Sequence, residues 1–189
     1  MAQPANILLR QKRFTARDLW RMPDDGNRYE IIDGEVFVTP APYVSHQEVL
    51  ANLNDILRRH VRKHRLGLLL FAPVGVVLEP LSGVEPDLIF VAAARRAIVQ
   101  SKGIFGPPDL AVEILSPATA ARDRGRKKVL YARTGIAHYW MVDPRKGTLV
   151  ALRLDGDDYA IDAEVGPRGT FKPPLFPGLA IRMRDVLKR

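Results

Sequence analysis

Three acidic residues lie within stretches whose apolar residues predict β-strands. Glu30 interrupts RYEII, Asp87 opens DLIFV, and Glu113 lies inside LAVEIL. An ionised carboxylate in an apolar strand costs several kcal/mol unless a partner compensates its charge. Chains keep such acids as ion-pair partners, at strand ends that reach water, or as ligands for metal ions.

Each acid also has a purely structural interpretation, which the residues alone leave open. Glu30 could pair with Arg28 across a hairpin. Asp87 follows a proline and could cap a turn. Glu113 has apolar neighbours on both sides, so a structural role explains it least well.

The spacing of Asp87 and Glu113 suggests metal chemistry. If their two strands pair in one sheet, both carboxylates can meet at a shared edge. Two carboxylates, a backbone carbonyl and water suit Mg²⁺ or Mn²⁺, which prefer hard oxygen ligands. The chain has no cysteine, and its histidines show no zinc-binding spacing; they are His46, His60, His64 and His138.

The elements that must position these acids can be read from turn signals and periodicity. Residues 28–38 predict a β-hairpin that turns at Asp33-Gly34. Apolar residues at 3.6-residue spacing predict a helix over 46–64, ended by Gly67. A second helix is predicted over 123–134.

The remaining elements are predicted from short apolar runs between turn residues. We expect a short helix at 15–22, a turn at 79–86, a basic helix or loop at 92–108, and a short strand or helix at 181–188. We expect strands at 68–71, 75–78, 87–91, 109–115, 137–142, 147–154 and 158–164.

Length and composition indicate an ordinary globular protein. Of the 189 residues, 47% are hydrophobic and 26% are charged, which fits one well-buried core. We therefore predict a lead-in at 1–13 and a single domain at 14–189. No apolar run approaches the roughly 20 residues of a membrane-spanning helix, and no signal peptide is evident. The expected location is the cytoplasm, without membrane association.

The charge balance favours a polyanionic partner. Lys and Arg total 29 against 21 Asp and Glu, which gives a net charge of +8. Two groups of basic residues are candidates for phosphate contacts. One lies on the first helix and comprises Arg58, Arg59, Arg62 and Lys63, and the other comprises Arg122, Arg124, Arg126 and Lys128.

The order of the acids resembles a known nuclease signature. Pro86-Asp87, followed by Glu113-Ile114-Leu115, is similar to the motif of the PD-(D/E)XK nuclease superfamily. In that motif a lysine stands two residues after the second acid, on the same face of the strand. Leu115 occupies this position here, so the chain departs from the basic pattern.

Several segments together resemble the Uma-two family of nuclease-like proteins. They are RYEIIDGEV at 28–36, SHQEVLANL at 45–53, EPDLIFV at 85–91, PDLAVEILSPAT at 108–119, DRGRKKVLYARTGIAHYWMVD at 123–143 and LFPGL at 175–179. In that family the lysine lies on the helix after the acidic strand, a position that Lys127 matches. Asp123, Lys127 and Tyr131 share one helix face, whereas Lys128 faces elsewhere.

The resemblance implies an α/β fold with a mixed sheet, namely a restriction-endonuclease-like αβββαβ core with an N-terminal hairpin and C-terminal strands. It also implies that Asp87, Glu113 and the Ile114 carbonyl bind Mg²⁺ or Mn²⁺, and that Glu30 binds a second ion or orients water. Lys127 would hold the attacking water or stabilise the phosphate.

The resemblance further implies a supporting role for His46, Asp123 and Tyr131. The expected partner is nucleic acid, DNA rather than RNA. A homodimer is expected by analogy with enzymes that cut both strands.

Three other functions remain open at this stage. Leu115 in place of lysine, and His138 where the family has an acid, fit a non-catalytic nucleic-acid-binding or regulatory protein on a nuclease fold. Glu30 and Glu113 could be the acid and base of a glycosidase, although aromatic residues make up only 7%. The chain could also be a toxin, antitoxin or assembly partner. We interpret His138 as a structural histidine.

Overall fold

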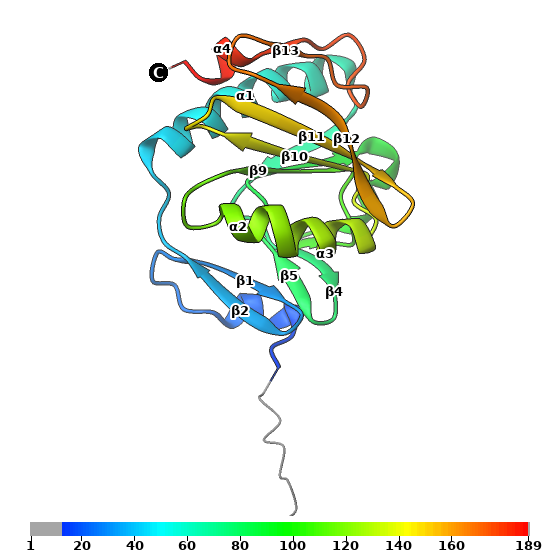
Figure 1. Ribbon diagram of the computed structural model, residues 1–189. Coiled ribbons are helices and arrows are strands. Elements are labelled where there is room, and N and C mark those ends of the chain that lie inside the picture. Colours follow the sequence, from blue (N-terminus) through cyan, green and yellow to red (C-terminus); the bar gives the residue numbers. More distant parts are fainter. Residues whose placement is uncertain (1–12, 189) are drawn as a thin grey trace, which may run out of the picture.

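The computed structural model describes residues 13–188, so all of the predicted lead-in except Arg13 lies outside the described residues. Two six-stranded sheets form the body of the protein, with helices on both faces of one of them (Figure 1). A third, two-stranded sheet pairs β13 (Thr170–Phe171) with β14 (Ile181–Arg182). The predicted α/β class with a mixed sheet is confirmed.

The first sheet, here called the N-terminal sheet, contains the predicted hairpin. Its strand order is β2 (Glu35–Thr39), β1 (Arg28–Ile32), β5 (Ser82–Val84), β4 (Val76–Glu79), β8 (Gly103–Phe105) and β7 (Val99–Gln100). The hairpin turns at Asp33 and Gly34, whose φ angles are 55° and 82°. Two positive φ angles are the signature of a type I′ turn, which the Asp-Gly pair accommodates.

The second sheet, here called the core sheet, carries two of the three strand acids at or next to its central strands. Its order is β12 (Asp158–Val165), β11 (Thr148–Asp155), β10 (His138–Asp143), β9 (Leu110–Ile114), β6 (Leu88–Ala92) and β3 (Gly67–Phe71). Strands β9 and β10 run parallel, and the other neighbours run antiparallel. The predicted hairpin near residues 147–164 is therefore confirmed as β11 and β12.

One face of the core sheet is covered by α1 (Val44–His64) and the short α4 (Met183–Val186). Apolar residues of α1 recur at helical spacing and are buried, among them Val49, Leu53 and Leu57. They pack in one hydrophobic cluster with β3, β6, β9, β10 and the C-terminal segment. This packing fixes α1, and hence His46 in its first turn, against the sheet.

The opposite face of the core sheet is covered by one nearly continuous helix and by the N-terminal sheet (Figure 1). The helix consists of α2 (Ala120–Arg122), η3 (Asp123–Lys127) and α3 (Lys128–Arg133). Its middle part, η3, is π-helical. Such stretches are rare and occur frequently at functional sites. The space between this helix and the two sheets is where the strand acids meet.

Some local predictions need correction. The strand at 75–78 forms as β4, but it pairs in the N-terminal sheet. The expected turn at 79–86 contains β5, and the stretch at 92–108 contains η2 (Ala93–Ile98), β7 and β8. Strands this short carry too few residues for a visible alternation.

Gly67 does not end α1 as predicted. The helix ends at His64, and Arg65 adopts the left-handed conformation with φ 54°. Gly67 instead begins β3, where an added Cβ would lie 2.1 Å from the Val91 carbonyl oxygen. The expected helix near 15–22 is η1 (Ala16–Arg21). Among the described residues, no helix has the length and apolar character needed to cross a membrane.

Candidate functional site

Strand alternation aims Glu113 at the space between the two sheets. Val112 and Ile114 of β9 pack in the cluster under α1, whereas Ala111 and Leu115 belong to the cluster on the other face. Because side chains alternate along a strand, Glu113 shares the face of Ala111 and Leu115. Leu115, at the usual lysine position of the nuclease motif, is a buried core residue.

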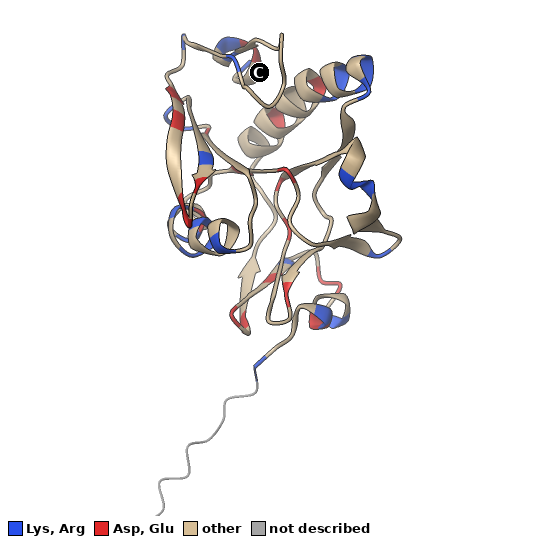
Figure 2. Cartoon of the chain, turned by 90° about the vertical axis from the view of Figure 1, so that its right-hand side faces the viewer, with Lys and Arg blue, Asp and Glu red and all other residues tan. Residues whose placement is uncertain are grey.

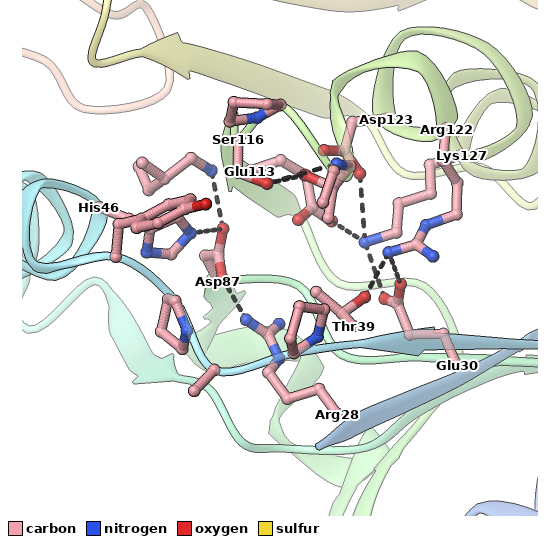
Figure 3. A pocket seen from close by; sticks show the side chains of 18 residues that line it. Arg28, Glu30, Thr39, His46, Asp87, Glu113, Ser116, Arg122, Asp123 and Lys127 are labelled. Carbon is pink, nitrogen blue, oxygen red and sulfur yellow. Dashed lines mark hydrogen bonds and ion pairs between the residues drawn. The ribbon is translucent and has the colours of Figure 1, made fainter. Parts of the chain in front are cut away.

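A pocket of about 460 Å³ opens at this place. Its walls include Thr39 at the end of β2, residues 40–43 between β2 and α1, and residues 116–119 between β9 and α2. Figure 3 shows acidic and basic side chains gathered around it, among them Glu30, Asp87, Glu113 and Lys127. The structure thereby brings together most of the predicted site residues: Glu30, His46, Asp87, Glu113, Ile114, Asp123 and Lys127. Tyr131 does not line the pocket, but its hydroxyl donates a hydrogen bond to Glu113.

Asp87 lies on one side of the pocket among hydrogen-bond donors. Arg28 Nη1 donates to its Oδ1 at 2.7 Å, while the Ile114 N–H and His46 Nε2 lie 2.8 and 3.2 Å from Oδ2. Burial alone would raise the pKa of this carboxyl, but His46 and Arg28 outweigh burial and lower it to about 2. The carboxylate is therefore ionised and held in place, and it does not merely cap a turn.

Lys127 lies on the other side, between three carboxylates. Its Nζ is 2.7 Å from Glu30 Oε1, 2.8 Å from Glu113 Oε1 and 3.5 Å from Asp123 Oδ1. The side chain is only 2% exposed. Burial opposes the charge of the amine, but the acids, Glu113 foremost, raise the pKa of Lys127 above its usual value. Lys127 is thus a buried cation.

Glu113 is the acid that this arrangement compensates least. Its Oε1 accepts hydrogen bonds from both Lys127 Nζ and Tyr131 OH, each at 2.8 Å. Burial raises its pKa to about 8, and the neighbouring acids Asp123, Asp87 and Glu30 add to the effect against Lys127. Lys127 and Arg122 supply two positive charges to three buried acids, and Arg122 contacts Glu30 rather than Glu113. The protonated form of Glu113 is therefore favoured.

Glu30 pairs with two cations from the helix that covers the pocket. Lys127 contacts its Oε1, and Arg122 Nη2 lies 3.3 Å from its Oε2. Burial raises the pKa of Glu30, but these two cations reverse the effect and lower it. The alternative ion pair with Arg28 is wrong, because Arg28 turns towards Asp87 and Glu85.

The helix face predicted from spacing is the face that meets the acids. Asp123, Lys127 and Tyr131 are all buried and all reach this cluster. Tyr139 OH supports the turn by donating to the Asp123 carbonyl at 3.0 Å. Lys128 points away and pairs with Asp158 at 3.0 Å. The choice of Lys127 over Lys128 as the lysine next to the acids thus matches the geometry.

Two site residues were missing from the predicted set or were given another role. Arg28 holds Asp87, and its position two residues before Glu30 on one strand could have placed it in the pocket. Arg122 was predicted to contact phosphate, but in the structure it pairs with Glu30 and contacts Thr39.

The predicted phosphate-contact residues lie in several places. Arg124, Arg126 and Lys128 each pair with an acid of the chain. The basic group of α1 lies at the last turns of that helix, visible as one blue end in Figure 2. Arg58 follows His46 by twelve residues, which is about 18 Å along a helix. His138 is half-buried and does not line the pocket, as expected of a structural residue.

The chemistry of the donor set fits a divalent cation, although within residues 13–188 no three acids or histidines are arranged to hold one directly. Glu30, Asp87, Glu113 and Asp123 face three permanent cations: Arg28, Arg122 and Lys127. The pocket therefore carries one more acid than fixed cations. A hard divalent ion would match the carboxylate oxygens and would compete with the proton that otherwise neutralises Glu113. The role of the Ile114 carbonyl stays a prediction.

Comparison with known proteins agrees with this geometry. A family model named Uma2, with the description "Putative restriction endonuclease", matches residues 16–184. The chain belongs to the Uma2 family. The resemblance read from the sequence is confirmed. No match was found among curated proteins.

A solved structure shows the same fold as this Uma2 chain. It is described as the crystal structure of a putative nuclease belonging to DUF820 from Anabaena variabilis. The TM-score is 0.74 at 18% sequence identity, and the match covers 92% of this chain and 97% of the other. The restriction-endonuclease-like fold is thereby confirmed, and family and fold together support a nuclease.

Proposed function

We propose that this protein is a metal-dependent endonuclease that hydrolyses phosphodiester bonds of DNA. The observation that carries the proposal is the position of Lys127. Its amine is buried within 2.8 Å of both Glu30 and Glu113, in the pocket that also contains Asp87. Three acids and a lysine in one pocket are the groups that a PD-(D/E)XK-type reaction requires, with the lysine supplied from the helix.

We assign separate roles in the reaction to the acids, to Lys127 and to the residues that support them. Asp87 and Glu113, with the Ile114 carbonyl, would bind Mg²⁺ or Mn²⁺, and Glu30 would bind a second ion or orient water. When bound, the ion activates a water molecule and withdraws charge from the phosphate. Lys127 would position that water or stabilise the developing negative charge. His46, Asp123 and Tyr131 keep these groups oriented through the contacts described above.

The partners follow from charge and from the reaction. A net charge of +8 favours a polyanion, and DNA is the proposed substrate. Cutting both strands of a duplex would require two pockets, so we propose a homodimer. A cytoplasmic location belongs to the same proposal. A glycosidase is disfavoured, because the Lys127 amine lies within 2.8 Å of both Glu30 and Glu113 and occupies the place between them that a sugar would need.

The test is cleavage of supercoiled plasmid and single-stranded DNA in Mg²⁺, Mn²⁺ or EDTA. We expect metal-dependent nicking by the natural protein and a loss of at least about 10²-fold in Glu113→Gln. Glu35→Gln is the control, since Glu35 is an exposed acid that pairs with Arg126 and does not line the pocket. No cleavage by the natural protein, with DNA and metal both bound, would overturn the proposal in favour of a non-catalytic binding protein.

A further inference from the structure

We propose that the DNA backbone leaves the catalytic pocket over Ser116 and Pro117 and is held by Arg145 and Lys146. This inference rests on the proposed function and names the path of its substrate. It differs from the prediction made from sequence, which placed phosphate contacts on the last turns of α1 and on residues 122–128.

The first observation is a second hollow that adjoins the pocket. It has a volume of about 440 Å³ and shares Ser116 and Pro117 with the catalytic pocket as lining residues. Its far side is formed by Asp143, Arg145 and Lys146. A DNA strand lying across the pocket would therefore reach this hollow by passing Ser116 and Pro117.

The topology explains why the two hollows adjoin. Strands β9 and β10 run parallel, and Glu113 lies opposite Met141. Their carboxyl ends open at the same edge of the core sheet, where open α/β sheets commonly bind ligands. β9 continues into Ser116, and β10 continues into the turn at 144–147. Ser116 is three positions after Glu113, at most about 11 Å of chain, or roughly three base-pair steps of duplex DNA.

The charges of the second hollow favour an anion. Asp143 is the acid that lines it, and Arg124 pairs with that acid at 3.2 Å. The Asp143 carboxylate also accepts hydrogen bonds from the backbone N–H groups of Arg145 and Lys146, at 3.0 and 3.2 Å. These bonds fix the turn, while both basic side chains are exposed and form no ion pair with any described residue.

A third hollow, on the other side of Arg145 and Lys146, is a less suitable path for the DNA backbone. It also contains Arg145 and Lys146, but its wall includes Glu48. The basic residues of α1 are no better placed, because Arg58 and Lys63 lie about 18 and 26 Å along the helix from His46. The unpaired charges nearest to the pocket along a continuous lining are therefore those of Arg145 and Lys146.

The experiment measures binding without catalysis. A fluorescent DNA duplex of arbitrary sequence is titrated in EDTA at several salt concentrations with the natural protein, Arg145→Ala/Lys146→Ala and Arg58→Ala/Arg59→Ala. Both variants lose two exposed positive charges, and alanine keeps the backbone N–H groups that bond Asp143. We expect Arg145→Ala/Lys146→Ala to bind about tenfold more weakly and to lower the salt slope by about 2. The α1 variant should retain the natural slope.

An equal loss in both variants, a loss confined to the α1 variant, or no DNA binding by the natural protein would overturn the proposed path. The plasmid assay separates this outcome from a failure of the proposed function. Metal-dependent cleavage with no change of slope in Arg145→Ala/Lys146→Ala would reject the path and keep the nuclease. A lower salt slope in Arg145→Ala/Lys146→Ala without any cleavage by the natural protein would support the proposed path of the DNA and reject the proposed nuclease activity.

Discussion

The two sides of the pocket that we propose to be catalytic hold their acids in opposite charge states. Asp87 is surrounded by donors, and its pKa is lowered to about 2. Glu113 shares a single lysine with two other acids, and its pKa is raised to about 8. The strands that carry them are hydrogen-bonded neighbours, since β6 pairs with β9. Local partners, rather than position in the sheet, therefore decide which acid is ionised before a cation arrives.

This difference assigns separate tasks to the two sides. The Asp87 side offers a fixed negative charge at neutral pH. The Lys127 side holds an excess of acid that is tolerated because one carboxyl stays protonated. The contribution of the Lys127 side to the stability of the protein must then depend on the lysine, on pH and on bound cations.

Removal of the lysine should have the largest effect. Lys127→Ala leaves Glu30, Glu113 and Asp123 buried without their shared cation, and we expect a loss of about 3–5 kcal/mol in the free energy of unfolding. Urea denaturation measures it. Lys128→Ala is the matched control, because that lysine pairs with the exposed Asp158, and it should change stability little.

A second substitution sharpens this result. Lys127→Ala combined with Glu30→Gln should recover part of the loss, since the pKa of Glu30 is lowered in the natural protein and one buried charge is then absent. Equal stabilities of Lys127→Ala and Lys128→Ala would contradict the view that a buried cation holds this side together.

Divalent metal should stabilise the natural protein by a smaller amount. At a concentration one hundred times the dissociation constant, binding to the folded state contributes about 2.7 kcal/mol. Thermal unfolding with Mn²⁺ and with EDTA measures the difference. We expect the stabilisation by Mn²⁺ to vanish in both Asp87→Asn and Glu113→Gln and to persist in Glu35→Gln. An undiminished increment in either site variant would show that the ion binds elsewhere.

The fold was more predictable from sequence than the pairing inside the pocket. The Asp33-Gly34 turn, the periodic apolar face of α1 and the apolar run around Glu113 are local signals, and each predicted the element that forms. The partners of Glu30 and Asp87 are not local. Arg28 reaches an acid 59 residues away, and no spacing rule assigns it to Asp87 rather than to Glu30.

Lys127 is an instructive intermediate case. Its residue type and its helix predict only a solvated lysine, because long charged side chains usually keep their charge in water. The family resemblance, together with the shared face of Asp123 and Tyr131, indicated the buried position that the structure shows. The π-helical turn could not be anticipated, because no residue type specifies it.

The pH dependence of metal-free stability should separate the two sides. The folded pKa of Glu113 is about 8, above its usual 4.5, so the folded state retains a proton that the unfolded state releases. Stability from this group is therefore full below pH 4.5 and is lost as pH rises towards 8, at up to about 1.4 kcal/mol per pH unit. Denaturation in EDTA from pH 5 to 8 measures it.

Glu113→Gln cannot ionise and should flatten this slope, so that at pH 8 the metal-free variant is more stable than the natural protein. A natural protein whose stability is constant over the same range, or a variant with an unchanged slope, would show that Glu113 is ionised throughout and that the two sides do not differ.

The smallest effect is expected on the Asp87 side. Arg28→Gln removes the charge that lies 2.7 Å from Asp87 Oδ1, while His46 and the Ile114 N–H remain. We expect the pKa of Asp87 to rise from about 2 by roughly one unit or more, measured by NMR titration of the metal-free carboxyl carbon. Because the folded pKa is lowered, the stability from Asp87 is fully present above pH 3.8 and is lost as pH falls towards 2. In the variant the loss should still begin near pH 3.8, but it should be smaller and end at a higher pH.

The control for this titration is Arg95→Gln, which breaks a comparable pair with Asp109 at 3.0 Å. It should leave the titration of Asp87 unchanged. If Arg28→Gln also leaves it unchanged, then His46 and one backbone N–H suffice to hold the carboxylate ionised. The difference between the pKa values of Asp87 and Glu113 would then be explained by hydrogen-bond donors alone. The number of charged groups around each acid would not be needed to explain it.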